Sequence, residues 1–434
     1  MSHDQSSRAA ITRRDFVRTT ALTSAGALAL GRVATARPRA MDTIQVGIIG
    51  CGGRGTGAVM QALKADTNAQ LTAMADAFPE RIETCRDYLM QNEAIADRVA
   101  VQEADCYAGF DGYKELIDSG VDMVILTTPP VFRPMHLEYA ISRGKHVFCE
   151  KPVAVDAPGI RSVLATTAEA KRRNLALMSG FCWRYNFPQR ETYGRIHDGQ
   201  IGDVTAIHTT YNTGPLGDVA RDPSWSDTEW QLRNWKAFTW SSGDHIVEQA
   251  IHAIDWIHWA LQGELPTRAY AVGGRQCRTG AWTGNLYDHF SVVYEFASGA
   301  RGFHMCRQIP DCTNDNSAYI MGTKGTCKSN PWAPNSIVMT GEQPWRYTGP
   351  NNDMYQTEHD ELFASIRAGT PINDGVHMAH STMMGIMGRM CAYTGEALTW
   401  DQCMASQEDL TPATWEWGDR PFPPVAMPSE RQYR

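Results

Sequence analysis

The 434-residue sequence lacks the features that mark several protein classes. Lysine and arginine number 40 against 48 aspartates and glutamates, and the formal net charge is -8, so the basic excess of a nucleic-acid-binding protein is missing. No stretch reaches the roughly 20 apolar residues that a membrane-spanning helix needs. The eleven cysteines are an odd number and form no C-x-x-C pair, which argues against a small disulfide scaffold. The length instead favours two domains with large cores.

The first 36 residues resemble an export signal. Arg13 and Arg14 are followed by the weakly apolar run ALTSAGALALG and then by the small-residue pattern of residues 34–36. This order is typical of a twin-arginine signal peptide, which is removed from the mature protein. We therefore expect a mature chain that begins near Arg37, has no membrane anchor and is exported already folded by the twin-arginine machinery. Its location would be periplasmic or secreted.

A dinucleotide-binding unit is predicted from residue 43 onward. The apolar run TIQVGIIG is typical of a buried parallel strand, and the turn CGGRGTG leads from it into a helical pattern. Gly50, Gly52 and Gly55 form the motif G-x-G-x-x-G. The first glycine allows a tight turn, the second lets the backbone approach a pyrophosphate, and the third permits close helix packing. A doubly wound α/β fold is the expected result.

Asp76 ends a second apolar run, at about the distance from the glycines where an acid accepts the ribose hydroxyls of NAD. An acid there repels the 2′-phosphate of NADP, so we favour NAD. Arg81 keeps NADP open, because an arginine can accommodate that phosphate. The ends of the parallel strands face the ligand crevice, which adds a group of residues to the predicted cofactor site: Gly53, Arg54, Thr127, Thr128, Pro129, His136, Glu150 and Lys151.

The stretch EQAIHAIDW, residues 248–256, carries a second group of polar side chains. Glu248, His252 and Asp255 are spaced by four and three residues, so a single helix would present all three on one face. His245 lies three residues earlier. The stripe is a catalytic device, a partly buried polar seam or, with His245, Glu248 and His252 as ligands, the zinc site of a metal-dependent hydrolase. Zinc would explain neither the glycine motif nor Asp76, so we favour the first interpretation and expect no metal.

Taken together, these motifs resemble the Gfo/Idh/MocA family of nicotinamide-dependent sugar oxidoreductases. The resemblance rests on the glycine turn, Asp76, TTPP, GKHVFCEKP, MSGFCWRYNFP and the helix with His252, and it covers roughly residues 43–400. It implies an N-terminal Rossmann domain with a doubly wound parallel sheet over residues 43–180. A C-terminal α/β domain over residues 181–404 would contain a large, mostly antiparallel sheet that forms the substrate floor and often the oligomer interface. A Pro- and Trp-rich extended tail would follow over residues 405–434.

The resemblance also implies roles for individual residues. Lys151 of the EKP motif corresponds to the lysine that contacts substrate and nicotinamide, and His252 corresponds to the catalytic histidine. Glu248 stands where many members have aspartate, so the resemblance defines the division of roles between Glu248 and His252 less closely. The remaining residues expected on the substrate side are Arg184, Tyr185, Trp235, His245 and Asp255.

Oxidation of a secondary alcohol needs a hydride acceptor, a base and a positive charge that stabilises the alkoxide. NAD supplies the first, while Lys151 and His252 can share the proton, and Glu248 can orient the imidazole or bind a neighbouring hydroxyl. We therefore expect an exported oxidoreductase, a dimer or tetramer, that retains NAD and acts on a sugar, glycoside or polyol. A redox-neutral glycosidase that works by transient oxidation and elimination uses the same groups and remains an alternative. A cofactor-binding scaffold without turnover would have no need of these side chains.

Overall fold

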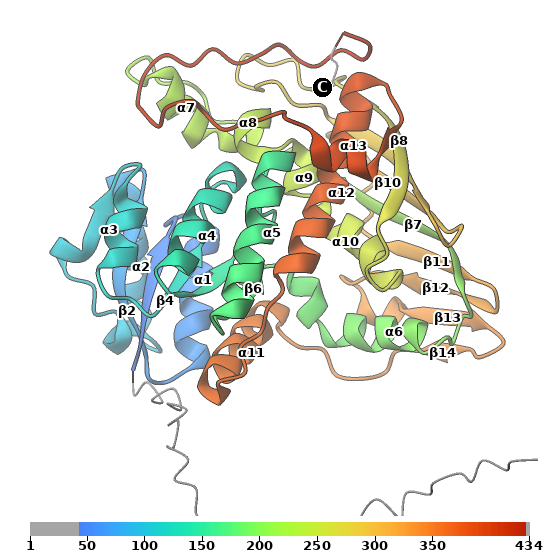
Figure 1. Cartoon of the computed structure of the whole chain (residues 1–434), viewed down its shortest axis with the longest axis horizontal. Helices are drawn as coiled ribbons and strands as arrows, with labels where there is room; N and C mark the ends of the chain where they lie inside the picture. Colours follow the sequence, from blue (N-terminus) through green and yellow to red (C-terminus); the bar gives the residue numbers. More distant parts are fainter. Residues whose placement is uncertain (1–42, 431–434) are drawn as a thin grey trace, which may run out of the picture. The chain divides into compact units, whose positions relative to one another are not determined.

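The computed structural model describes residues 43–430, and the predicted signal peptide lies outside them. Two sheets and the helices around them make up this part of the chain (Figure 1). Sheet A is formed from the first part of the sequence and sheet B from the second. Among the described helices, none combines the length and apolar character needed to cross a membrane.

Sheet A is parallel throughout, with the strand order β3-β2-β1-β4-β5-β6. The described strands are β1 (Ile44–Ile49), β2 (Ala69–Asp76), β3 (Cys106–Ala108), β4 (Met123–Leu126), β5 (His146–Cys149) and β6 (Leu177–Ser179). The helices between them are α1 (Gly53–Ala65), α2 (Pro79–Met90), α3 (Gly112–Asp118), α4 (Arg133–Ser142) and α5 (Ala157–Arg172). Strand β4 reads MVIL and is wholly buried, as expected of a strand covered on both faces. The predicted doubly wound sheet is confirmed.

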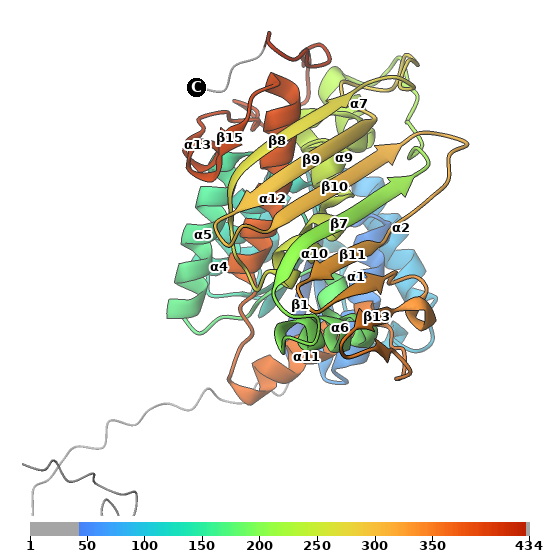
Figure 2. The ribbon, with the colours of Figure 1, turned by 90° about the vertical axis from the view of Figure 1, so that its right-hand side faces the viewer.

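Sheet B has the strand order β14-β13-β12-β11-β7-β10-β9-β8-β15 and is mostly antiparallel, as predicted (Figure 2). Strands β7 and β10 are a parallel pair within it. Burial alternates along β9 and β10, because one face packs on helices and the other does not. The described strands are β7 (Val204–Thr213), β8 (Pro266–Gly274), β9 (His289–Phe296), β10 (Arg301–Gln308), β11 (Ala318–Gly322), β12 (Gly325–Ser329), β13 (Val338–Gly341), β14 (Trp345–Arg346) and β15 (Leu398–Thr399).

The helices of the second part pack between the two sheets and at their ends. They are α6 (Phe187–His197), α7 (Asp227–Arg233), α8 (Thr239–Ser242), α9 (His245–Glu248), α10 (Ile251–Ala260), α11 (Met354–Ala368), α12 (Gly375–Thr394) and α13 (Trp400–Ala405). Short 3₁₀ turns include η3 (Pro130–Phe132), η4 (Cys182–Tyr185) and η5 (Trp235–Ala237). Helix α12 packs on both β8 and α5, and its methionines, alanines and glycines are buried around most of its circumference.

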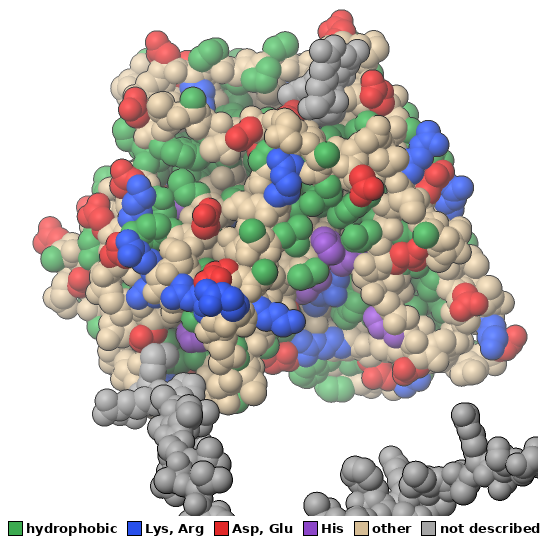
Figure 3. Space-filling model, viewed as in Figure 1, with side chains coloured by type: hydrophobic (Ala, Val, Ile, Leu, Met, Phe, Trp, Pro, Cys, Tyr) green, Lys and Arg blue, Asp and Glu red, His purple; other side chains and the backbone are tan. Residues whose placement is uncertain are grey.

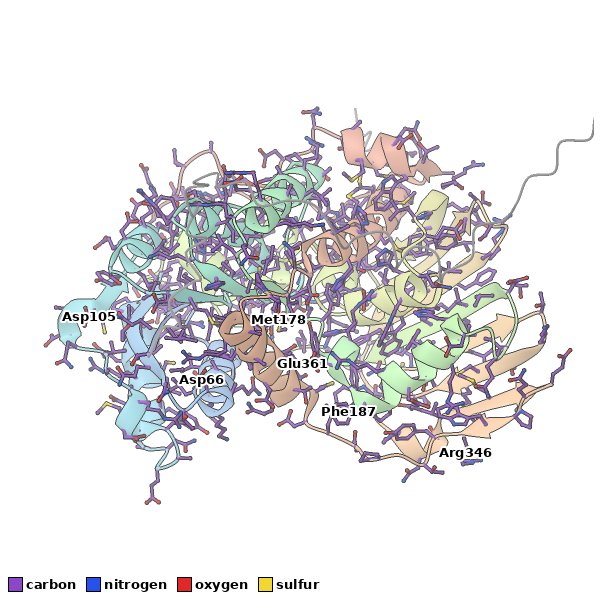
Figure 4. All side chains as sticks on the ribbon, turned by 60° about the horizontal axis from the view of Figure 1, so that its bottom comes forward. Asp66, Asp105, Met178, Phe187, Arg346 and Glu361 are labelled. Carbon is purple, nitrogen blue, oxygen red and sulfur yellow. The ribbon has the colours of Figure 1, made fainter. Side chains whose placement is uncertain are left out.

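Helix α11 belongs to the second part of the sequence but packs against α1 of the first. Its Arg367 forms an ion pair with Asp66, at 2.7 Å between Nε and Oδ2, and its Glu361 pairs with Arg190 of α6; Figure 4 labels Asp66 and Glu361. After this helix, Leu177 of β6 donates its N–H to the carbonyl of Ile372. Part of the chain beyond residue 350 therefore packs on the helices and strands of sheet A. The predicted domain boundary at residue 180 assigns this segment to the second domain alone.

Gly55 allows α1 to approach the end of β1. Replacing it with alanine would place a methyl carbon 2.1 Å from the Gly50 carbonyl oxygen and 2.8 Å from Thr127 Oγ1. We expect Gly55→Ala to lower the free energy of unfolding by about 1–3 kcal/mol, because overpacking forces the backbone to shift. Urea denaturation followed by circular dichroism measures this change.

Gly57→Ala in the same helix is the matched control. The nearest atom to the added carbon, Arg54 Nη1, would be 3.6 Å away, so we expect a change between zero and about 1 kcal/mol of stabilisation. Equal unfolding free energies for the two variants would contradict the packing role of Gly55.

Candidate active site

A cavity of about 290 Å³ lies at the carboxyl ends of β1, β2 and β4. Most of the residues predicted to bind the cofactor line it: Gly50, Gly52, Gly53, Arg54, Gly55, Asp76, Arg81, Thr127, Thr128, Pro129 and His136. Trp235 of η5, which the sequence assigned to the substrate, also lines this cavity. Glu150 and Lys151 lie outside its lining. The structure thus brings the motifs of three separate strands together in one place.

The glycine turn leaves backbone groups open toward the cavity. Gly50 has φ 102°, and an added Cβ would lie 2.6 Å from the backbone nitrogen of Thr128, so a side chain does not fit. Thr127 Oγ1 donates to the Gly50 carbonyl at 2.6 Å and holds the turn. Helix α1 has no side-chain cap at Gly52, so its first N–H groups and the positive end of its dipole are available to a pyrophosphate.

Asp76 is held by the backbone on both sides. Its Oδ2 accepts the N–H of Cys51 at 2.7 Å, and its Oδ1 accepts the N–H of Phe78 at 3.0 Å. Burial raises the pKa of Asp76, while these two N–H groups and Arg81 act in the opposite direction. Each carboxylate oxygen keeps a second lone pair, so the fixed group can accept two ribose hydroxyls.

An aromatic wall, defined as Phe78, Phe110, Tyr113 and Phe132, forms part of the cavity and was missed by the sequence reasoning. Phe78 follows β2, Phe110 follows β3, and Phe132 follows β4, so their positions just after strand ends are the signal that could have found them. His136 stacks on Tyr113 with 4.3 Å between ring centroids. Burial, together with the charge of Arg133, lowers the pKa of His136 to about 3, so this imidazole is neutral.

The Glu150 carboxylate fixes the loop that carries Lys151 by hydrogen bonds. Its carboxylate accepts from Arg54 Nε and from the backbone N–H of Lys151, the latter at 3.0 Å. Burial alone would raise the pKa of Glu150, but Arg54, Lys151 and Arg133 outweigh it, and the pKa lies below its usual range. A Cβ on Gly180 would lie 2.7 Å from this carboxyl group, so glycine is required opposite it. The charged carboxylate therefore ties the glycine turn to the EKP motif.

Lys151 reaches from this loop to the second part of the chain. Its Nζ donates to the backbone carbonyl of Glu248, at the end of α9, at 2.7 Å. The carbonyls of the last helical turn have no partner within the helix, so a lysine is a suitable donor there. The carboxylate of Glu248 is partly exposed and forms no hydrogen bond with the residues that the structure describes.

The prediction of a single helical face is wrong. Helix α9 ends at Glu248 and α10 begins at Ile251, with Gln249 at φ -109° and ψ -51° between them. His252 and Asp255 therefore share α10, whereas Glu248 lies on the preceding helix. The break leaves the Glu248 carbonyl free to accept from Lys151.

His252, the histidine predicted to be catalytic, is buried in the structure. It is 9% exposed, lies edge-on to Phe181, and its Nδ1 has no hydrogen-bond partner within residues 43–430. Burial lowers its pKa well below the usual value, and the nearby positive charge of Lys151 lowers it further. The imidazole is therefore neutral at physiological pH.

Asp255, Arg184 and Tyr185 do not face an open site as predicted. Asp255 is buried and binds Arg184, at 2.8 Å between Oδ1 and Nη2, and the hydroxyl of Ser381 at 2.6 Å. Burial would raise the pKa of Asp255, but Arg184 outweighs it and lowers the pKa. Tyr185 is buried and donates to Asp374 Oδ2 at 2.7 Å. These groups hold the helices around His252 in place.

His245 also has a different role from the predicted one. It is buried against Phe290, and its Nδ1 lies 3.1 Å from Asp244 Oδ1. Among the described residues, no three His, Cys, Asp or Glu side chains are grouped so that they could hold a metal ion. His245, Glu248 and His252 therefore do not form the zinc site that the spacing allowed.

Known proteins resemble the chain along most of its described length. Inositol 2-dehydrogenase of Rhizobium meliloti (strain 1021) is 26% identical over 325 residues, which are 74% of this chain and 86% of that protein. Trans-1,2-dihydrobenzene-1,2-diol dehydrogenase of Sus scrofa is 23% identical over 69% of this chain and 85% of its own length. 2,7-anhydro-N-acetylneuraminate hydratase of Escherichia coli (strain K12) is 29% identical over 48% of this chain and 51% of its own.

Solved structures share the fold. Aldose-aldose oxidoreductase from Caulobacter crescentus, in complex with glycerol, has a TM-score of 0.64 at 21% identity and covers 82% of this chain and 99% of its own. GenD2 from gentamicin A biosynthesis, in complex with NAD, has a TM-score of 0.63 at 17% identity, with 87% and 99% covered.

Family models account for both parts of the chain. Residues 44–180 match the oxidoreductase family with an NAD-binding Rossmann fold, and residues 190–328 match the GFO/IDH/MocA C-terminal domain. These matches agree with the two sheets, the glycine turn and the cavity at the strand ends. The chain belongs to the Gfo/Idh/MocA family of NAD-binding oxidoreductases.

Proposed function

We propose that this protein oxidises a secondary hydroxyl of a sugar, glycoside or polyol to the ketone, or reduces such a ketone to the hydroxyl, with an NAD that stays bound between turnovers. The observation that carries the proposal is the connection between cavity and proton-transfer groups. Arg54 of the cavity wall binds Glu150, the adjacent Lys151 reaches Glu248, and His252 lies close enough for the charge of Lys151 to depress its pKa. The relatives named as inositol and dihydrodiol dehydrogenases act on hydroxyl-bearing rings and support this substrate class.

Bound NAD would supply the hydride acceptor, and the chain's own residues would handle the proton. Lys151 Nζ, which donates to the Glu248 carbonyl, can donate a further hydrogen bond to a substrate oxygen and settle its negative charge. His252 is neutral and its Nδ1 has no partner among the described residues, so the ring can form a hydrogen bond with the substrate hydroxyl and serve in the transfer of its proton. The Glu248 carboxylate can accept a hydrogen bond from a neighbouring hydroxyl and so orient the ring.

A redox-neutral reaction is the second candidate for the same site. The Escherichia coli relative is named a hydratase, and a hydration brings about no net oxidation. Transient oxidation at a ring carbon acidifies the neighbouring C–H, so that a glycosidic bond can be eliminated. Water then adds to the resulting double bond, and the ketone is reduced again. Lys151 and His252 would serve this glycosidase in the same proton-transfer roles.

Purification of the mature protein without added cofactor tests the proposal directly. We expect bound nicotinamide in the near-ultraviolet absorbance, and a change in its redox state when one member of a panel of sugars, polyols and aryl glycosides is added. Release of aglycone without a lasting change in that absorbance would favour the glycosidase. A protein that neither retains nor binds NAD would contradict both candidates.

Lys151→Ala provides the matched test of the proton-transfer site in the same assay. We expect a loss of about 10²- to 10⁴-fold in turnover with bound NAD retained, because Lys151 lies outside the cavity lining. Lys171→Ala, which removes an exposed lysine of α5, should leave turnover unchanged. Full activity of the Lys151 variant would refute its assigned role.

Asp76 should determine the choice between NAD and NADP. We expect Asp76→Asn to weaken the binding of NAD at least about tenfold, because the side chain that accepts the ribose hydroxyls loses its charge. The preference for NAD over NADP should become smaller, since Arg81 remains. Titration of the cofactor-free protein with both dinucleotides measures the ratio of the dissociation constants. Glu83→Gln, an exposed change on α2, is the control. An unchanged ratio in the Asp76 variant would show that the acid does not select the cofactor.

We also propose that the protein is exported through its twin-arginine signal and forms a homo-oligomer through sheet B. Tyr270, Phe303 and Tyr319 are exposed and share one cross-strand row of this sheet. Such an apolar row is suited to a second copy. Phe303→Asp should reduce the mass in solution, measured by light scattering, to that of one chain, whereas Val376→Asp on α12 should not. A single-chain mass for the unmodified protein would contradict the oligomer.

A further inference from the structure

The C-terminal tail, residues 406–430, is fastened along the outside of the site. It leaves α13 and runs over α7 and α8, where it is drawn in red in Figure 1. Near its start, the N–H of Leu410 donates to Asp156 at 2.7 Å, and Glu408 pairs with buried Arg389 at 3.0 Å. Near its end, the N–H of Ser429 donates to the carbonyl of Thr394 at 2.9 Å. The tail is therefore held at both ends.

Between these ends, two tryptophans of the tail pack on the aromatic wall of the dinucleotide cavity. Trp415 stacks on Phe132 with 4.3 Å between centroids, and Trp417 lies 4.5 Å from Phe110 and 5.3 Å from Phe78. Figure 3 shows hydrophobic side chains gathered on this face between α7 and the upper ends of α3 and α4. The tail thus contacts three of the four wall residues from behind.

The tail also holds a second group of residues that line the cavity. Leu232, Trp235 and Lys236, which line the cavity, come from α7 and η5, outside the Rossmann unit. The N–H of Thr228 in α7 donates to the carbonyl of Gly418 at 3.0 Å, and Gln231 donates to that of Arg420. One continuous segment therefore contacts both the aromatic wall and α7, which carries Leu232 of the cavity lining.

We propose that Trp415 and Trp417 are positioning residues that keep the dinucleotide cavity closed. They act through the aromatic wall and α7, both of which contribute lining residues to the cavity, so loosening them should let a bound dinucleotide leave faster. This inference rests on the proposed function, because it explains how NAD is retained between turnovers. It assigns to the tail a part in cofactor binding that the matched family domains, which end at residue 328, do not contain.

The rate of cofactor release tests the inference. Each protein is loaded with NADH and mixed with excess NAD, and the loss of bound-nicotinamide fluorescence is followed by stopped flow. We expect the double variant Trp415→Ala, Trp417→Ala to release NADH about tenfold to a hundredfold faster, since several aromatic contacts are lost. Trp417→Ala alone removes a side chain that is 44% exposed and so serves as a milder variant.

Other readouts separate positioning from a general loss of structure. Turnover at saturating added NAD and the melting temperature of the cofactor-free protein should stay near the unmodified values, and Trp→Phe at both positions should restore slow release. Met427→Ala, an exposed change in the same tail, is the control. Equal release rates in the double variant and the unmodified protein would overturn this inference alone. Failure of the unmodified protein to bind NADH would overturn the proposed function and the inference together.

Discussion

The ion pair between Arg54 and Glu150 is the interaction on which the site depends. A buried carboxylate is tolerated only when it is paired and hydrogen-bonded, and removal of one partner of such a pair typically costs about 3–5 kcal/mol. Glu150 obtains its partners from the glycine turn and from the N–H of Lys151, and Gly180 leaves the space for its carboxyl group. Arg54 also binds Glu358 of α11 at 2.9 Å. One guanidinium therefore connects the cofactor turn, the lysine loop and the helix that returns from the second part of the chain.

The position of Lys151 also depends on the break between α9 and α10. A continuous helix would use the Glu248 carbonyl in its own hydrogen bonding, whereas the break leaves it to accept from Lys151. The same break starts α10 at Ile251, which places His252 in its first turn, while Asp255 further along is fixed by Arg184. Two different ion pairs therefore fix the two groups: Arg54 and Glu150 hold the loop of Lys151, and Arg184 and Asp255 hold the helix of His252.

The sequence was sufficient to predict the cofactor half of the site and much of the fold. Strand ends, glycine spacing and Asp76 are local features, and the carboxyl ends of parallel strands meet by geometry, so the cavity could be assembled without coordinates. The errors have a common cause. Spacing alone cannot show whether His245, Tyr185 and Asp255 point outward, because their directions are set by Asp244, Asp374 and Arg184, partners that tertiary structure brings to them. The return of α11 to α1 was missed for the same reason.

The groups proposed for catalysis and the elements proposed to close the cavity are stabilised by different kinds of interaction. Glu150 and Asp255 are fixed by charged pairs in the interior, which are costly to break, and Lys151 is anchored on the backbone carbonyl of Glu248. The wall of the cavity formed by Phe110 and Phe132 is backed by partly exposed tryptophans of the tail, whose contacts are individually worth about 0.5–1.5 kcal/mol. A change that loosens the outer wall therefore need not disturb Glu150, Lys151 or Asp255, so the proposed retention of the cofactor and the proposed chemistry can be tested independently.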